Sequence, residues 1–193
     1  MFHKILNFPK VPTHLVNEIF EVVKDPYNMD LKKHQDHTGY KEFKNRQLKK
    51  LNGQEITSVS VDRFKISESL DTWLKNHVHP LPRRQHIAFY NSSSSDMGPH
   101  VDADRDTVWI YVIDTGGHKV ETVWYREPEQ KIIRPDLQNI AIDYMNAAIC
   151  DYTKLVEIER YEIPAHTWIE INSSILHSVE GLDRNRLTIQ VTP

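Results

Sequence analysis

Six segments beyond residue 85 carry the pattern of β-strands, and they constrain the fold more than any other feature of the chain. They are rich in β-branched and aromatic residues, and several alternate in the strand period of two. The segments are 86–91, 107–113, 119–125, 155–163, 167–172 and 186–191. Turn signals such as Thr115-Gly116-Gly117 separate them. Because strands and helices do not alternate along the chain, the pattern argues against a parallel α/β fold.

Two segments in the first half have the spacing of amphipathic helices. In residues 12–24 apolar side chains recur three and four positions apart, and Thr13 is a candidate N-cap. Residues 67–78 repeat the pattern with Ser67 as candidate cap, and prolines end the helix. A stretch at 136–150 is either helical or a mobile insertion between strands. Helices followed by short strands predict a mainly β fold with flanking helices outside a β-sandwich or jelly roll.

Size and composition indicate a single domain over residues 1–193. We expect a helical layer with an early strand or strands over 1–84, and a jelly-roll core over 85–193. The single cysteine, Cys150, excludes an internal disulfide framework and favours a reducing compartment, the cytoplasm. No segment has the length of a membrane-spanning helix, and the net charge of −3 gives no general attraction to nucleic acid. We therefore expect neither a membrane nor a nucleic-acid partner.

His100 and Asp102 form a candidate pair of metal ligands. In an extended segment residues i and i+2 point to the same side, so an imidazole nitrogen and a carboxylate oxygen could share one ion. A distant histidine would complete a set of two histidines and one carboxylate, the ligand set of non-haem Fe(II) oxygenases. A second copy, His34 with Asp36, has no strand around it and is interpreted as surface. Asp104 shares the strand parity and is a weaker rival to Asp102.

The remaining candidates begin 75 residues after Asp102. His177 follows a predicted strand and is the candidate third ligand. Arg186 and Thr188 lie two apart on the last predicted strand, so they share one face while apolar residues take the other. A guanidinium that faces the interior of a β-fold is costly without an anion, and it binds a carboxylate through two hydrogen bonds. Arg184 is the rival arginine.

In this order, the candidates resemble the motif of the 2-oxoglutarate/Fe(II)-dependent oxygenases, which is His-x-Asp, a distal histidine, and Arg-x-Ser/Thr shortly after it. The sequence LHSVEG around His177 is similar to the family's distal segment. Within this family, the motif is most similar to those of the aspartyl/asparaginyl β-hydroxylase-like branch and the small prolyl hydroxylases. The resemblance covers roughly residues 85–193.

The resemblance implies a double-stranded β-helix, the cupin-like jelly roll, with an iron site and a hydroxylase activity. The implied ligands of Fe(II) are His100, Asp102 and His177. The co-substrate 2-oxoglutarate would bind the iron, O2 would bind after it, and Arg186 with Thr188 would hold the far carboxylate of the keto acid. Trp109 and Tyr111 occupy the predicted inward positions of the strand after the metal motif, and the Tyr111 hydroxyl is expected to hydrogen-bond the co-substrate.

Two other functions stay open beside this hydroxylase. One is a cupin-type metalloprotein that does not use 2-oxoglutarate, which would leave Arg186 unexplained. The other is a non-catalytic jelly-roll binding module, which needs no metal. Binding of 2-oxoglutarate would distinguish the hydroxylase from both of these alternatives. For the hydroxylase, the expected substrate is an amino acid, a peptide side chain or a small metabolite.

Overall fold

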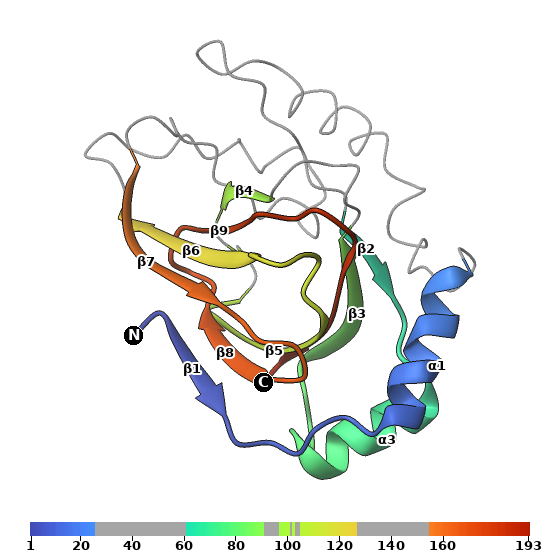
Figure 1. The fold of residues 1–193 in the computed structure, drawn as a ribbon. Helices are drawn as coiled ribbons and strands as arrows, with labels where there is room; N and C mark the ends of the chain where they lie inside the picture. Colours follow the sequence, from blue (N-terminus) through green and yellow to red (C-terminus); the bar gives the residue numbers. More distant parts are fainter. Residues whose placement is uncertain (26–60, 91–96, 101, 103–104, 127–154) are drawn as a thin grey trace, which may run out of the picture.

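The structure is a computed structural model that describes residues 1–25, 61–90, 97–100, 102, 105–126 and 155–193 (Figure 1). The helix or insertion expected at 136–150 lies outside these residues. So do His34, Asp36, Asp104 and Cys150.

The strands of the described chain form two antiparallel sheets (Figure 1). The larger sheet has the order β1-β8-β5-β10-β3-β2, and the smaller sheet has the order β4-β9-β6-β7. The strands of the larger sheet are β1 His3–Leu6, β2 Val61–Phe64, β3 Arg84–Tyr90, β5 Thr107–Asp114, β8 Trp168–Asn172 and β10 Arg186–Thr192. Those of the smaller sheet are β4 Met97–His100, β6 Glu121–Arg126, β7 Val156–Glu162 and β9 His177–Glu180. The predicted mainly β fold is confirmed.

All six predicted strands are present, with ends that differ by at most two residues from the prediction. The four additional strands, β1, β2, β4 and β9, have four residues each, too few for a clear alternation pattern. β1 and β2 are the early strands expected before residue 85, and they form the two edges of the larger sheet.

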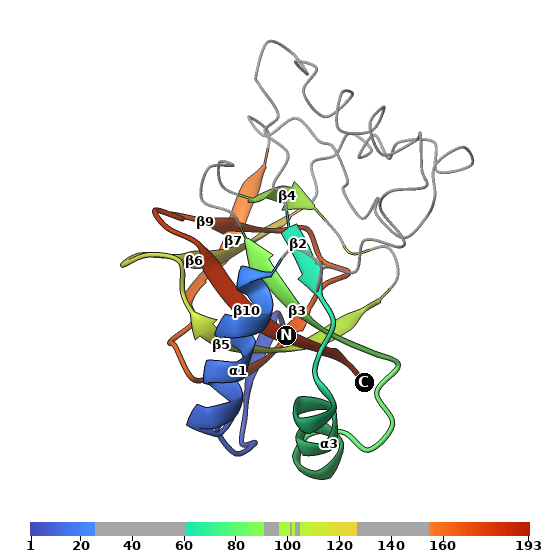
Figure 2. The same ribbon diagram turned by 90° about the vertical axis from the view of Figure 1, so that its right-hand side faces the viewer.

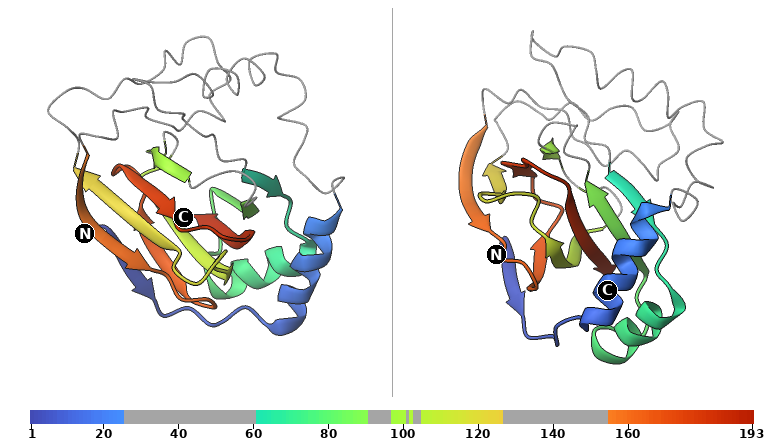
Figure 3. Two further views of the ribbon diagram at one scale, coloured as in Figure 1. Left: turned by 45° about the horizontal axis from the view of Figure 1, so that its top comes forward. Right: turned by 45° about the vertical axis from the view of Figure 1, so that its right-hand side comes forward.

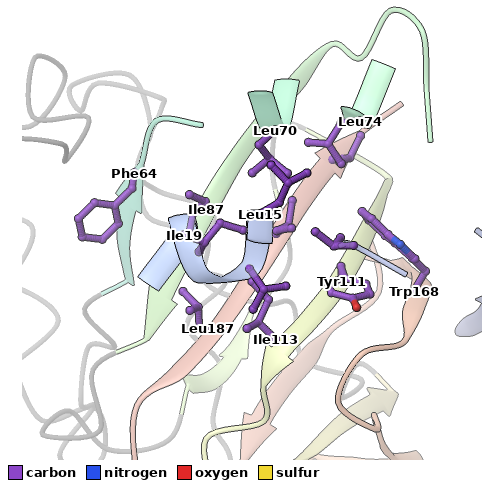
Figure 4. Packing of buried hydrophobic residues seen from close by; sticks show 14 residues of the cluster. Leu15, Ile19, Phe64, Leu70, Leu74, Ile87, Tyr111, Ile113, Trp168 and Leu187 are labelled. Carbon is purple, nitrogen blue, oxygen red and sulfur yellow. The ribbon is translucent and has the colours of Figure 1, made fainter. Parts of the chain in front are cut away.

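Two helices, α1 Thr13–Lys24 and α3 Glu68–His77, cover the outer face of the larger sheet (Figures 2 and 3). Their apolar faces pack on the sheet in one buried cluster (Figure 4). Members of this helix-side cluster are Leu15, Ile19, Leu70, Leu74, Ile87, Tyr111, Trp168, Leu187, Ile189 and Val191. Neither helix in the described part of the chain reaches the length and apolar character that a membrane span requires.

A second buried cluster fills the space between the two sheets. It joins Val108, Ile110 and Val112 of β5 and Ile169 and Ile171 of β8 to Trp124 of β6. Because the larger sheet has helices on one face and the smaller sheet on the other, its central strands are buried on both sides. All seven residues of β10 are buried.

The caps of the two helices differ from each other. The Ser67 hydroxyl accepts a hydrogen bond from the Leu70 amide at 3.2 Å, so the predicted cap of α3 is confirmed. At α1 the cap position belongs to Pro12 and no side chain caps the helix, so the prediction for Thr13 is wrong by one residue.

Replacing Ser67 with alanine is expected to lower the free energy of unfolding by about 1 kcal/mol, because the Leu70 amide loses its acceptor. The matched control, Thr13→Ala, removes no cap and is expected to stay within about 0.5 kcal/mol of the parent protein. Urea denaturation of the three proteins measures both values. Equal losses in the two variants would contradict the assignment of the cap.

Candidate metal and anion site

β10 has one apolar face and one polar face, and both are buried. Leu187, Ile189 and Val191 pack in the helix-side cluster. The residues of the other parity, Arg186, Thr188, Gln190 and Thr192, therefore face the smaller sheet. The prediction that Arg186 and Thr188 share a face opposite the apolar residues is confirmed. This polar row is the starting point of the site.

Arg186 is almost completely enclosed, with 3% of its surface exposed. Its Nε is buried and has no hydrogen-bond partner among the described residues, and the same holds for the hydroxyl of the fully buried Thr188. The guanidinium carbon lies 5.9 Å from the centre of the Tyr90 ring. Burial lowers the pKa of Arg186, and the neighbouring Tyr90 opposes this shift. A cation and a hydroxyl with unused hydrogen-bonding capacity are suited to an anion.

The turn after β5 holds the start of β10 in place. Gly116 has φ +85°, a left-handed conformation that favours glycine, and a Cβ there would lie 2.8 Å from the Cβ of Arg186. The Gly116 carbonyl accepts hydrogen bonds from the amides of Asp183 and Arg184, at 3.0 and 2.9 Å. The close approach of this turn fixes where Arg186 enters the interior.

Arg184, the rival arginine, lies on the surface. Its side chain is 56% exposed, and its Nε lies 3.3 Å from Oδ1 of Asp114. Of the two arginines, Arg186 is therefore the one in the interior of the protein.

Two of the three predicted metal ligands lie opposite each other on neighbouring strands. The register of β4 and β9 pairs His100 with His177. His177 is 4% exposed, and its Nδ1 lies 2.8 Å from the main-chain oxygen of Ile175. If Nδ1 carries the proton and donates it to this carbonyl, the ring has its lone pair on Nε2. Histidines that bind metals usually have their other ring nitrogen held in this way.

Ser173 anchors the segment that carries Asp102. This fully buried residue accepts a hydrogen bond from the Asp102 amide at 2.8 Å and donates its own amide to the Asp106 carbonyl at 2.8 Å. Its hydroxyl donates to the carbonyl of Arg105 at 3.1 Å. Asp102 is thus fixed two residues beyond His100, beside the turn that joins β8 to β9.

A chain of hydrogen bonds joins Asp102 to the polar row of β10. The Arg105 Nε lies 2.6 Å from Oδ2 of Asp102, and the two side chains are only 9% and 8% exposed. The other end of the guanidinium donates to the Gln190 side-chain oxygen at 3.0 Å, and the Gln190 amide donates to the Tyr90 hydroxyl at 2.8 Å. The network therefore connects the candidate metal ligand Asp102 to Tyr90, the residue whose ring faces the Arg186 guanidinium.

These residues fit a metal site in their chemistry. The contact of His177 Nδ1 with the Ile175 carbonyl leaves Nε2 for coordination, and the Asp102 carboxylate is oriented by an arginine, as metal-binding carboxylates commonly are. Among the side chains that the structure describes, no three or more His, Cys, Asp or Glu residues are grouped to hold a metal ion. The side chain of His100 lies outside that description.

Tyr111 does not lie on the side of the co-substrate residues. The register pairs Tyr111 with Ile189 and pairs Thr188 with Val112, so Tyr111 faces the helices (Figure 4). Its ring centre lies 5.0 Å from that of Trp168. The expected contact between Tyr111 and the keto acid is therefore wrong, and so is the inward direction of Trp109, whose indole donates to Glu170 at 2.8 Å. Both faces of β5 are apolar and buried. The hydrophobic pattern of the sequence therefore does not show which alternate residues face the smaller sheet.

The polar neighbours of the site have little signal in the sequence. Ser173, Arg105 and Gln190 position Asp102, and their only signal in the sequence is that Gln190 shares the parity of Arg186. His86 is 7% exposed, and neither ring nitrogen has a hydrogen-bond partner among the described residues. Burial is the main cause that holds the His86 pKa well below its usual value, and three nearby arginines act in the same direction.

Comparisons with known proteins do not assign the chain to a family. No family model and no curated protein matches the chain. The X-ray structure of E. coli ycfD matches with a TM-score of 0.29 and 20% sequence identity. That match covers 55% of this chain and 24% of the other, so this chain spans about a quarter of that protein. A likeness this weak carries no argument about fold or function.

Proposed function

We propose that the protein is an Fe(II)- and 2-oxoglutarate-dependent oxygenase, a hydroxylase of an amino acid, a peptide side chain or a small metabolite. The observation that carries the proposal is the enclosed Arg186 guanidinium, whose Nε lies unpartnered among the described residues on the same face as the Thr188 hydroxyl. A buried cation of this kind calls for an anionic ligand, and a carboxylate matches the planar guanidinium. The single cysteine supports placing this activity in the cytoplasm.

The order of the strands supports a jelly roll, the double-stranded β-helix of such enzymes. From β3 to β10 the chain passes between the two antiparallel sheets repeatedly, with β3, β5, β8 and β10 in the larger and β4, β6, β7 and β9 in the smaller. The motif residues fall on β4, β9 and β10 or directly after them. Of these residues, His100 and His177 are far apart in the sequence and are paired in the register of β4 and β9.

In this proposal His100, Asp102 and His177 hold the iron. When bound, Fe(II) supplies the activation of O2, coupled to the conversion of 2-oxoglutarate into succinate and CO2. The hydrogen bond at Nδ1 of His177 would fix the ring orientation and leave the Nε2 lone pair to bind the metal. Arg105 orients the Asp102 carboxylate through its 2.6 Å contact.

Arg186 and Thr188 determine how the co-substrate lies. The guanidinium binds the far carboxylate of the keto acid, and the Thr188 hydroxyl donates to the same group. Their burial between the sheets excludes water, which strengthens both contacts. The keto-acid end of the molecule is then left to reach the histidine pair on β4 and β9.

Anaerobic titration of the Fe(II)-loaded protein with 2-oxoglutarate tests the proposal. We expect a weak visible charge-transfer band from the chelated keto acid, which saturates with added 2-oxoglutarate and is absent when succinate replaces it. Succinate is the matched control because it keeps both carboxylates and lacks the 2-oxo group. Iron binding without a band would indicate a cupin-type metalloprotein of another kind. No iron binding would indicate a non-catalytic binding module.

A further inference from the structure

The strand β9 is short, and it begins with His177, one of the proposed iron ligands. It has four residues and lies between β4 and β6 in the smaller sheet (Figure 1). Its register with β4 contains an irregularity between Met97 and His100, whereas its register with β6 pairs all four residues. The position of His177 therefore depends mainly on how firmly β9 is held to β6.

Ser178 and Glu180 lie on the face of β9 opposite His177. His177 is paired with Trp124, which belongs to the cluster between the sheets, so His177 faces the larger sheet. Because side chains alternate along a strand, Ser178 and Glu180 point away from the larger sheet. Contacts on this outer face can therefore hold β9 without occupying the space beside the proposed iron.

Tyr125 of β6 contacts β9 on both sides of His177. Its amide donates a hydrogen bond to the carbonyl of Leu176 at 2.9 Å, one residue before His177. Its hydroxyl lies 3.0 Å from the hydroxyl of Ser178, one residue after His177. The same hydroxyl donates a hydrogen bond to Oε1 of Glu180. Tyr125 therefore ties both flanks of the histidine to the neighbouring strand.

The Glu180 carboxylate joins the three strands β6, β7 and β9. Its Oε1 accepts hydrogen bonds from the Tyr125 hydroxyl and from the Ser178 hydroxyl, the latter at 3.0 Å. Its Oε2 accepts one from Arg160 of β7 at 3.1 Å. Burial, and then the hydrogen bond to Glu180, raise the pKa of Tyr125, so its hydroxyl keeps its proton and remains a donor. These contacts cross-link the smaller sheet on its outer face.

An irregularity in the pairing of β6 with β7 lies at Tyr125. The register shifts between Trp124 and Tyr125. Such bulges change the direction of a side chain and interrupt the regular ladder. On one side of the shift Trp124 packs between the sheets, and on the other side Tyr125 reaches across to β9. Because the ladder is irregular where β6 supports β9, the side-chain contacts of Tyr125 contribute more to holding β9 in place.

We propose that Tyr125 is a positioning residue for His177, which it holds in place through its contacts with both flanks of that histidine. The inference rests on the proposed function for the statement that His177 binds a metal. Tyr125 points away from the space between the sheets, so it acts on the metal only by fixing where the imidazole lies. Groups that orient a metal ligand in this way contribute about 10–100-fold to metal affinity.

The first part of the test compares Tyr125→Phe with the parent protein, both as full chains without metal. The substitution removes the hydroxyl and keeps the ring. Amide hydrogen exchange, followed by NMR, is expected to become about tenfold faster or more in β9, because a hydrogen bond to a charged group is lost, with little change in β5 and β10. With histidine rings labelled with ¹⁵N, the His177 ring signals, identified by their absence in His177→Gln, are expected to shift.

The second part measures Fe(II) binding by anaerobic equilibrium dialysis. Tyr125→Phe is expected to weaken it by about tenfold or more. Glu180→Gln, which keeps an acceptor oxygen for the Tyr125 hydroxyl and guards against misfolding, is expected to weaken it by less. The control Tyr161→Phe removes a hydroxyl from β7 and keeps the ring that stacks on His3 at 4.2 Å. It should leave both the exchange in β9 and the Fe(II) affinity unchanged.

The two parts let this proposal and the proposed function fail separately. If the parent protein bound no Fe(II), the proposed function would fail, and the exchange in β9 with the His177 ring signals would still decide the role of Tyr125. Unchanged His177 ring signals, equal acceleration of exchange in all strands, or the same effects in Tyr161→Phe would each overturn the positioning role. So would an unchanged Fe(II) affinity in Tyr125→Phe when the parent protein binds the metal.

Discussion

Replacing Arg186 with methionine is expected to weaken 2-oxoglutarate binding by about 2–5 kcal/mol, roughly 30-fold or more, without destabilising the ligand-free protein. The variant removes the buried cation that pairs with the far carboxylate. Without ligand, that cation has an Nε with no partner among the described residues. An apolar side chain of similar length is therefore neutral or stabilising. Anaerobic calorimetry measures the affinity, and thermal unfolding measures the stability.

Arg184→Met is the matched control for this prediction. The Arg184 side chain is exposed, and its described ion-pair partner is Asp114. Both the affinity for 2-oxoglutarate and the stability should therefore remain near the parent values. If Arg184→Met lost the keto acid and Arg186→Met kept it, the assignment of the carboxylate contact would be reversed. A large loss of stability in Arg186→Met would indicate a purely structural role.

Replacing His177 with alanine is expected to weaken Fe(II) binding by more than about 100-fold and to abolish turnover. Loss of a group that merely orients a ligand costs about 10–100-fold in metal affinity, so loss of a ligand costs more. The Ile175 carbonyl also loses the hydrogen bond from Nδ1, which costs about 1 kcal/mol of stability. Anaerobic equilibrium dialysis against Fe(II) measures the affinity, and circular dichroism verifies the fold.

His118→Ala is the control for the histidine prediction. His118 lies between β5 and β6, and its side chain is exposed. Iron affinity should therefore be unchanged in this variant. Retention of iron by His177→Ala, or its loss from His118→Ala, would exclude His177 as a ligand.

The β-structure was predictable because each long strand carries its own signal. The six strands with clear β-branched and aromatic patterns were found to within two residues at each end. The short strands β4 and β9 were not, although they carry His100 and His177. Their pairing depends on the partner strand, which a local pattern of four residues does not specify.

The site was predictable where polarity stands out against an apolar background. On β10 the alternation of Arg186 and Thr188 with leucine and isoleucine revealed which face each residue occupies. On β5 the same reasoning failed for Tyr111, because helices cover one face and the smaller sheet covers the other. The contacts of Tyr125 with β9 have no local signal because β6 and β9 come together only in the fold.

The position of β10 has a consequence for how the chain is synthesised. This strand lies between β5 and β3 in the larger sheet, yet it is translated after both of them and after β8. Until β10 emerges from the ribosome, the pair β5–β8 and the pair β2–β3 are not joined to each other. The edge of β5 and the edge of β3 that β10 will later cover are then exposed. We therefore expect the nascent chain to depend on chaperones until residue 192 is available, and folding to be completed only after that point.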